Sequence, residues 1–250
     1  MRLGVPLKLY PKAGKSLILD ISYQASMLSL IKLGLSNTNP RLFHQLYDSN
    51  QMKNFATSVF FPHARFQGKK ISLGEGQNAV LYFSTSDVKL GLNFFNAFQW
   101  LRNGDPKTFN SDLNVKVGRV VDVPVPIITS ERAVFKTMSP LVVRRQDGYF
   151  LSCIGENATN EYQNALRESI EIHQSSKKLK TLAEQLTFKP LKMKKTVINP
   201  FGQFIEASME MFELTANPVL QNEFLNSGLG GKRGSFAGML GLVKEVRDND

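Results

Sequence analysis

The order of strand-like and helix-like segments is the feature that most restricts the fold of this 250-residue chain. In the first half, stretches with a two-residue apolar alternation are separated by stretches whose apolar residues recur every three or four positions. We expect strands over residues 2–10, 56–61, 79–85 and 113–117, and helices from Ser22, over residues 41–48, and from Ser86 to about Leu101. Ser22 and Ser86 are the predicted N-caps. The main elements run strand, helix, strand, strand, helix, strand.

The second half repeats this order without a visible sequence repeat. We expect strands over residues 133–145 (interrupted at Pro140), 186–198, 204–214 and 239–245, a long helix over 156–186, a turn over 199–202 and a helix over 217–226. Along the third strand we expect Ile205, Ala207, Met209 and Met211 to point inward. This order defines the ferredoxin-like unit. We therefore predict an α+β fold of two tandem ferredoxin-like (RRM-like) βαββαβ domains, residues 1–122 and 129–250, joined by a proline-spaced linker over 122–128.

The chain is strongly basic, with 31 Lys and Arg against 21 Asp and Glu, a formal net charge of +10. Such an excess favours a polyanionic partner, nucleic acid first and an anionic membrane second, although basic proteins without such a partner exist. The single cysteine, Cys153, excludes an internal disulfide and a cysteine zinc site, and suits a reducing compartment. Without an apolar run of about 18 residues or a recognisable signal peptide, we expect a cytoplasmic protein that does not enter the membrane.

A glycine-rich stretch, residues 227–243, precedes the last expected strand. High glycine density permits positive φ angles and close approach of a ligand, and free amides can form an anion-binding concavity. Lys232 and Arg233 at its centre add positive charge where a phosphate would lie. The stretch contains Gly228, Gly230, Gly231, Gly234, Gly238 and Gly241. It fits neither the P-loop nor the dinucleotide fingerprint. We interpret it as a phosphate-backbone clamp; a flexible surface loop is the alternative.

Further basic residues in the second half could follow a phosphate backbone. On the strand over 186–198, Lys192 and Lys194 are expected to face one way, and Leu191 and Met193 the other. The candidate RNA-contacting cations are Arg144, Arg145, Lys189, Lys192, Lys194, Lys195, Lys232 and Arg233. A run of lysines is usually only a solvated face, but several on adjoining segments favour a nucleic-acid surface.

Three segments, in this order along the chain, carry a resemblance to a known family. They are residues 39–58, beginning Asn-Pro-Arg-Leu; residues 135–143, which contain Ser139-Pro140; and the glycine stretch with Gly228-Leu229-Gly230, Lys232 and Gly238-Met239. Together they resemble the CRISPR-associated repeat-RNA endoribonucleases of the RAMP superfamily. Phe236 departs from that family's loop pattern, which often ends with Gly-X-Gly. The resemblance implies that Gly228, Gly230, Gly231 and Gly238 contribute to RNA binding.

The resemblance also implies a reaction. These enzymes use no metal and no cofactor: the ribose 2′-OH attacks its own phosphate and leaves a 2′,3′-cyclic phosphate and a 5′-OH. His44 would act as general acid or base and Lys53 as the cation that stabilises charge, while Tyr47 stands as the alternative to His44 and Tyr23 as a weaker candidate. His63 could instead contact an RNA phosphate.

The implied partner is CRISPR repeat RNA, with other CRISPR-associated proteins as further candidates, and the chain could be a monomer or a homodimer. The second hypothesis is a non-catalytic RNA-binding subunit of a CRISPR effector complex. The glycine stretch fits both hypotheses, so the pair of His44 and Lys53 is what favours the nuclease.

Overall fold

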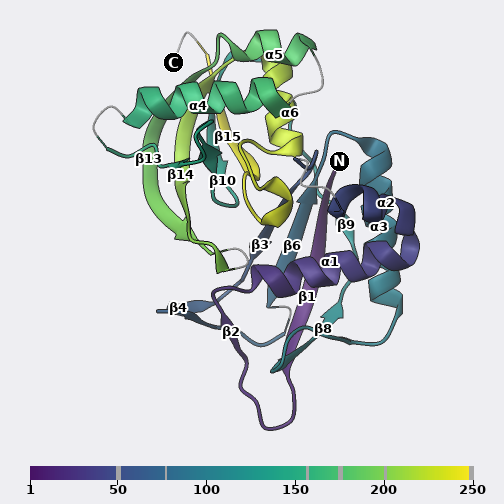
Figure 1. The fold of residues 1–250 in the computed structure, drawn as a ribbon. Helices are drawn as coiled ribbons and strands as arrows, with labels where there is room; N and C mark the ends of the chain where they lie inside the picture. The colour runs from purple at the N-terminus through teal and green to yellow at the C-terminus, as the bar shows by residue number, and fades with distance from the viewer. Residues whose placement is uncertain (49–51, 77, 156–157, 174–176, 200–201, 248–250) are drawn as a thin grey trace. The chain divides into compact units, whose positions relative to one another are not determined.

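A computed structural model of the chain describes residues 1–48, 52–76, 78–155, 158–173, 177–199 and 202–247 (Figure 1). The chain forms two compact units. The first contains Met1–Gln51 and Ser58–Pro124, and the second contains Met52–Thr57 and Val125–Asp250. The main division therefore falls inside the segment expected as a linker, and a short piece of the first half of the sequence belongs to the second unit.

The first unit is built on an antiparallel sheet with the strand order β3-β6-β1-β8-β7, with β9 paired to β1. Its strands are β1 (Arg2–Pro11), β3 (Ala56–Phe60), β6 (Ala79–Ser84), β7 (Lys107–Thr108), β8 (Leu113–Val117) and β9 (Val121–Asp122). The four long strands lie in the order second, third, first, fourth. This is the arrangement of a ferredoxin-like unit, and it confirms the expected fold of this half.

Two helices of the first unit bury the apolar faces that the sequence predicts. Helix α1 (Gln24–Thr38) buries Met27 and Ile31, and α3 (Val88–Asn103) buries Phe94 and Leu101. The short helix α2 (Pro40–Tyr47) follows α1 directly. A separate small sheet contains β2 (Ile18–Asp20), β4 (Arg65–Gln67) and β5 (Lys70–Ser72): β4 and β5 form a hairpin after β3, and β2, which we did not predict, joins it.

Both predicted N-caps of these helices are wrong by one residue. Tyr23 is the N-cap of α1, and it makes no side-chain capping bond. Ser22 lies one residue earlier, and its hydroxyl donates to Asp20 Oδ1 at 2.7 Å. At α3 the cap is Asp87, whose Oδ1 accepts from Leu90 N at 3.0 Å.

The second unit repeats the same strand order in its own antiparallel sheet, β13-β14-β10-β15. Its strands are β10 (Arg132–Thr137), β13 (Thr187–Ile198), β14 (Ile205–Thr215) and β15 (Leu240–Val246), with a small hairpin of β11 (Val143–Arg144) and β12 (Phe150–Leu151). Helices α4 (Ala158–His173) and α6 (Pro218–Ser227) cover one face of the sheet (Figure 1). The core between them includes Phe135, Tyr162, Phe188, Phe212 and Phe224. Asn217 caps α6 and Pro218 opens it, as expected.

Three sequence expectations in this unit need correction. The single long helix over 156–186 is two helices, α4 and α5 (Lys177–Ala183). Met209 and Met211 are only half-buried, while Phe212 and Leu214 are buried. The alternation shifts because Glu210 has a φ of +90°. Its amide donates to Thr137 Oγ1 at 2.9 Å.

Leu191 is the third correction, because its side chain is 43% exposed. The register of β13 against β14 shifts between Pro190 and Lys192, which turns Leu191 away from the core that Met193 joins. Of the turn expected over 199–202, Pro200 and Phe201 lie outside the described residues.

The segment between the units is attached to both of them. On one side, Val123 N donates to Arg2 O at 2.8 Å. On the other, Glu245 Oε2 accepts from Thr129 N at 2.9 Å and from Ser130 N at 2.6 Å. The expected linker is therefore tied down at each end.

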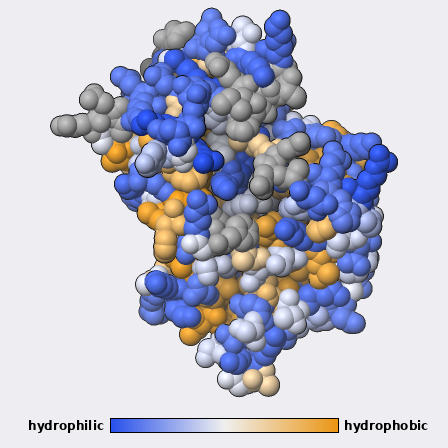
Figure 2. Space-filling model, viewed as in Figure 1, coloured by the Kyte–Doolittle hydropathy of each residue, from blue (hydrophilic) through white to orange (hydrophobic). Residues whose placement is uncertain are grey.

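The outer surface over α4 is mainly hydrophilic (Figure 2). Among the helices of the described residues, none has the length and hydropathy needed to cross a membrane.

Candidate functional site

The glycine-rich stretch forms a packed loop between α6 and β15, which we call the glycine loop (residues 228–239). Gly228, Gly230 and Gly238 have φ angles of +83°, +78° and +74° and are buried. A Cβ atom on Gly230 would collide with the carbonyl oxygen of Val142, and one on Gly238 with that of Leu229. Both positions thus require glycine for two reasons, backbone conformation and space. The packing argues against the alternative of a flexible surface loop.

The Ser-Pro segment after β10 holds one side of the glycine loop. Ser139 Oγ accepts from Met239 N at 2.9 Å, and Pro140 O accepts from Gly238 N at 2.8 Å. Val142 pairs with Gly231, whose amide donates to the Val142 carbonyl at 2.8 Å. Two of the three segments that carry the family resemblance are therefore in direct contact.

The segment Met52–Thr57 holds another side of the glycine loop within the same unit. The buried Thr57 hydroxyl donates to Arg233 O at 3.2 Å and accepts from Phe236 N at 3.1 Å. An added Cβ on Gly234 would lie 2.8 Å from Lys53 Cγ. The aliphatic stem of Lys53 therefore packs against the glycine loop. The residue expected to stabilise charge thus contacts the loop that we interpret as the phosphate clamp.

The two cations of the glycine loop differ in their exposure. Lys232 is exposed and has a left-handed backbone with a φ of +56°. Arg233 is only 6% exposed, and its Nη1 donates to Ser227 O and Gly228 O, each at 3.1 Å. Burial lowers the pKa of the Arg233 guanidinium to about 10, against an opposing effect of Glu223. Lys232 is therefore the cation that a ligand can reach.

His44 lies on α2 in the first unit, with its side chain 64% exposed. Asn39 caps this helix, since its Oδ1 accepts from Leu42 N at 3.0 Å. His44 Nδ1 lies 2.9 Å from Asp48 Oδ2, one turn further along. An ionised carboxylate can only accept a hydrogen bond, so Nδ1–H of His44 is the donor to Asp48. The other ring nitrogen, Nε2, is then the one left to accept a proton from a substrate.

Tyr47 is turned toward the packing of α2 rather than to solvent. Its hydroxyl is buried, and this burial raises the pKa of the phenol well above its usual range. The Lys32 ammonium lies 4.7 Å from the ring centroid, and the Phe43 ring lies 5.5 Å away. Burial likewise raises the pKa of Tyr23 to about 12. Both tyrosines are thus poor bases in this structure, whereas His44 is accessible.

The three candidate catalytic residues are not brought together within one unit. His44 and Tyr47 belong to the first unit, and Lys53 belongs to the second. Exposed His63, with a φ of +58°, is also in the first unit. The side chain of His173, at the end of α4, lies outside what the structure describes.

The lysines of β13 are all exposed, but they differ in their ion pairs. Lys195 Nζ lies 2.7 Å from Glu206 Oε2, and Lys194 Nζ lies 3.6 Å from Glu210 Oε1. Among the described residues, neither Lys189 nor Lys192 has an ion pair. Lys189 and Lys192 therefore keep the charge that is most available to a polyanion.

Strand pairing connects β13 to the glycine loop. Lys195 pairs with Ser208, Ser208 with Leu141, and the adjacent Val142 with Gly231. At the usual strand spacing, three such steps span roughly 14 Å. Lys195 and the glycine loop thus lie in one row of paired residues across the strands. A few nucleotides of RNA can cover the distance between them.

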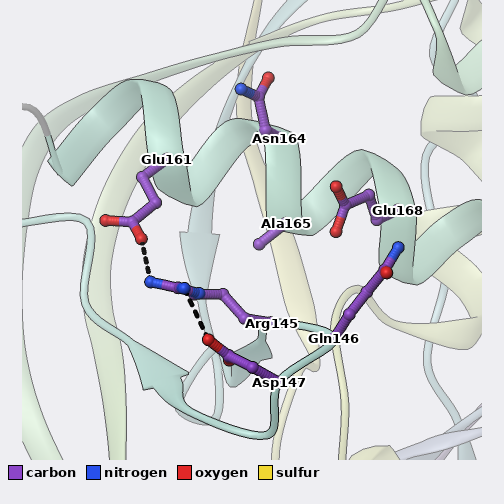
Figure 3. Close-up of a pocket in the computed structure, with 7 residues that line it drawn as sticks. All are labelled: Arg145, Gln146, Asp147, Glu161, Asn164, Ala165 and Glu168. Atoms are coloured by element: carbon purple, nitrogen blue, oxygen red, sulfur yellow. Dashed lines mark hydrogen bonds and ion pairs between the residues drawn. The ribbon is translucent and has the colours of Figure 1, made fainter.

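The two arginines near β11 are engaged locally. Arg145 lies between Asp147 and Glu161, at 2.5 and 2.6 Å, on the wall of a pocket of about 320 Å³ between α4 and the β11–β12 turn (Figure 3). The pocket is lined by Arg145, Gln146, Asp147, Glu161, Asn164, Ala165 and Glu168. Arg144 Nε donates to Gly148 O at 2.9 Å, and its guanidinium lies 5.5 Å from the centre of the Phe150 ring. Two carboxylates offset the charge of Arg145, which makes it a weaker candidate for RNA contact than Arg144.

Sequence reasoning did not single out the residues that hold the glycine loop. Thr57 and Ser139 were included only as parts of resembling segments, and Arg233 was assigned to RNA contact. A buried threonine in a strand carries no local signal of a partner 176 residues away. Within the described part of the chain, no cluster of three or more His, Cys, Asp or Glu side chains could hold a metal ion.

Several solved structures share the architecture of this chain. A RAMP protein described as binding different RNA substrates superposes with a TM-score of 0.80 at 21% identity, over 98% of this chain and 100% of its own. A Cas6-related protein from Pyrococcus furiosus gives 0.79 at 17% identity, over 98% and 99%. A Cas6 product complex gives 0.64 at 16% identity, over 97% and 100%. The chain thus has the tandem ferredoxin-like fold of RAMP proteins.

A family model matches part of the chain. Residues 122–242, just under half of the chain, match the family model described as CRISPR associated protein Cas6, C-terminal. Among curated proteins, no sequence matches the chain. The second half therefore resembles the C-terminal part of Cas6 proteins, in agreement with the expected family, and the whole chain shares its fold with solved Cas6 and RAMP structures.

Proposed function

We propose that this protein is an endoribonuclease that cleaves precursor CRISPR RNA within its repeats. One observation carries the proposal: the stem of Lys53 lies against a packed glycine loop, in the unit whose sequence matches Cas6. A fixed loop with the exposed Lys232 and a second cation beside it is suited to a phosphate backbone. Support also comes from similar structures described as binding RNA substrates and as a Cas6 product complex.

The proposed reaction is attack of a ribose 2′-OH on the adjacent phosphate. It needs a base at the 2′-oxygen, an acid at the leaving 5′-oxygen and a cation for the charge that develops on the phosphate. His44 Nε2 suits the proton transfer, because Asp48 fixes the ring through Nδ1. Lys53 suits the charge stabilisation, since the glycine loop supports its stem. The products are a 2′,3′-cyclic phosphate and a 5′-OH, and the reaction uses no metal.

The RNA-binding surface of the second unit combines the glycine loop with the basic strand β13. Lys232, Lys189 and Lys192 are the exposed cations with the best access, and Lys194, Lys195 and Arg144 add to them. The buried glycines Gly228, Gly230 and Gly238 shape the loop, and half-buried Gly231 links it to the sheet. RNA of this kind is read by shape, by its 2′-hydroxyls and by splayed bases.

A non-catalytic RNA-holding subunit is the second candidate. It is favoured by the likeness to a RAMP protein described by its binding of different RNA substrates. Both proposals include binding of repeat RNA, in a monomer or a homodimer, with other CRISPR-associated proteins as further partners.

A cleavage assay in EDTA separates the two candidates. The protein is incubated with a synthetic repeat RNA and, in parallel, with a copy that carries one 2′-deoxy nucleotide at the cut. Cleavage of the first RNA and not of the second supports metal-independent attack by the 2′-OH. Tight binding without cleavage, across several repeats, supports the RNA-holding subunit. Cleavage that requires a divalent metal contradicts the proposed mechanism.

A further inference from the structure

The guanidinium of Arg233 occupies the interior of the glycine loop instead of its surface. Burying a charge is costly unless its donors find acceptors. Here Nη1 bridges the carbonyls of Ser227 and Gly228, where α6 ends, whereas the buried Nε has no hydrogen-bond partner among the described residues. The carbonyl end of a helix carries partial negative charge, which suits a cation at this place. No phosphate oxygen can reach this guanidinium unless the loop opens.

The main chain of the same residue is tied to the other side of the loop. Arg233 O accepts from the Thr57 hydroxyl, and the same hydroxyl accepts from Phe236 N. Thr57 is fully buried, so breaking these bonds would leave polar groups without water. One short segment, Arg233–Ser235, is therefore fixed from two directions, by α6 through the Arg233 side chain and by Thr57 through the backbone.

The space above this segment is occupied by Lys53. Gly234 lies between Arg233 and Ser235, and a side chain there would collide with Lys53 Cγ and approach the Phe55 ring to 3.2 Å. The position of the Lys53 stem thus depends on where residues 233–235 lie. Lys232, with its left-handed backbone, immediately precedes them.

We propose that Arg233 and Thr57 are positioning residues, which lock the glycine loop to the segment Met52–Thr57 so that Lys53 and Lys232 are held as one unit toward the RNA. Arg233 itself makes no RNA contact. This inference rests on the proposed function and changes the role that the sequence suggests for Arg233. Of these two neighbouring cations, Lys232 contacts the phosphate backbone and Arg233 holds the shape of the glycine loop.

Salt dependence of RNA binding distinguishes these roles. Each phosphate contact adds about 1 to the slope of log affinity against log salt. Lys232→Ala is expected to reduce the slope by about 1. Arg233→Gln removes the charge but retains a side-chain N–H donor for the carbonyls of Ser227 and Gly228, so we expect Lys232 to stay in place and the slope to be unchanged. A slope that falls equally in both variants would overturn the inference, because it would show that Arg233 neutralises a phosphate.

Cleavage kinetics test the coupling to Lys53. Thr57→Val keeps the shape of the side chain and removes the hydroxyl together with both of its hydrogen bonds, so we expect kcat to fall at least about tenfold, with KM nearly unchanged. Thr57→Ser retains the hydroxyl and is expected to restore kcat. If Thr57→Val cleaves as fast as the wild type, Thr57 does not position the site.

Hydrogen exchange of the Phe236 amide gives a readout that needs no RNA. This amide donates to Thr57 Oγ1, so its exchange should accelerate at least about tenfold in Thr57→Val and stay protected in Thr57→Ser. Unchanged protection in Thr57→Val would overturn the coupling. A wild-type protein that binds no repeat RNA would overturn the proposed function, while the Phe236 amide would still decide whether Thr57 locks the loop.

Discussion

Helix α2 and the glycine loop carry the candidate residues of the same reaction, yet the chain builds them in opposite ways. Helix α2 has eight residues, none of them buried, and its histidine is fixed by one exposed contact to Asp48. The glycine loop is largely buried and is held by Ser139, Pro140, Val142 and Thr57. The proposed proton transfer is thus placed on an accessible element, and the proposed phosphate binding on a loop that several contacts hold in place.

This difference has a physical reason. A group that moves protons must reach its substrate, so it belongs on an exposed element. A clamp that relies on backbone shape gains from rigidity, because ordering the loop during binding would cost affinity. Substitutions on α2 should therefore change the rate of cleavage, whereas substitutions in the glycine loop should change stability and binding together.

Replacement of His44 should have the largest effect. His44→Ala removes the proposed proton-transfer group, and we expect cleavage to fall at least about tenfold, within the general acid–base range of 10²–10⁴. RNA affinity, measured by filter binding, should stay nearly intact because the side chain is not part of the glycine loop. Gln45→Ala, at an exposed position of the same helix, is the matched control. Equal cleavage by His44→Ala would remove this residue from the mechanism.

Alanine at Gly238 should have the next largest effect, on stability. Its positive φ and the collision with Leu229 O together should lower the free energy of unfolding by about 3 kcal/mol, which chemical denaturation can measure. Gly231→Ala is the control in the same loop. A Cβ there meets only Val142 atoms at 3.7 and 3.9 Å, so we expect little change. A similar loss of unfolding free energy in both variants would show that Gly238 is no more necessary than Gly231.

Two lysines of β13 are compared by the salt dependence of RNA binding. Lys192→Ala should reduce the salt slope of RNA binding by about 1, since this lysine has no ion pair among the described residues. Lys195→Ala should reduce it less, because Glu206 already offsets part of its charge. Titrations at several salt concentrations measure both slopes. A larger reduction for Lys195 would mean that the pair with Glu206 opens on the RNA.

The smallest expected effect concerns Glu245, which ties the inter-unit segment to β15. Hydrogen bonds from the amides of Thr129 and Ser130 lower the pKa of its carboxyl. A lowered folded-state pKa contributes stability above the unfolded value of about 4.3, and this contribution is lost as pH falls through the folded value. Glu245→Gln should therefore be less stable than the wild type at pH 7 and approach it in acid. Glu184→Gln, at an exposed residue after α5, should show no such convergence.

The regular part of the fold could be predicted because it depends on local periodicity. The alternation of β1 and the helical spacing of Met27, Ile31 and Phe94 are visible in the sequence, and their order defines the ferredoxin-like unit twice. The errors occur where a single residue interrupts the local sequence pattern. Asp87 replaced Ser86 as a cap, and the positive φ of Glu210 shifted the alternation of β14.

The candidate site was less predictable, because its defining contacts join distant parts of the sequence. A Gly-Lys-Arg-Gly run suggests two exposed cations, and nothing local indicates that Arg233 folds inward onto α6. The bond from Thr57 to Arg233 joins residues 176 positions apart. Sequence reasoning therefore located the loop correctly and assigned one of its two cations to a surface that it does not reach.

The membership of Met52–Thr57 in the second unit also bears on how such a chain can change over generations. A recombination event that exchanged everything after the inter-unit segment would deliver a glycine loop without Thr57 and without the lysine that lies on it. The two halves share one strand order and look like interchangeable modules. Because Met52–Thr57 from the first half of the sequence is built into the second unit, such an exchange would separate the glycine loop from the segment that holds it.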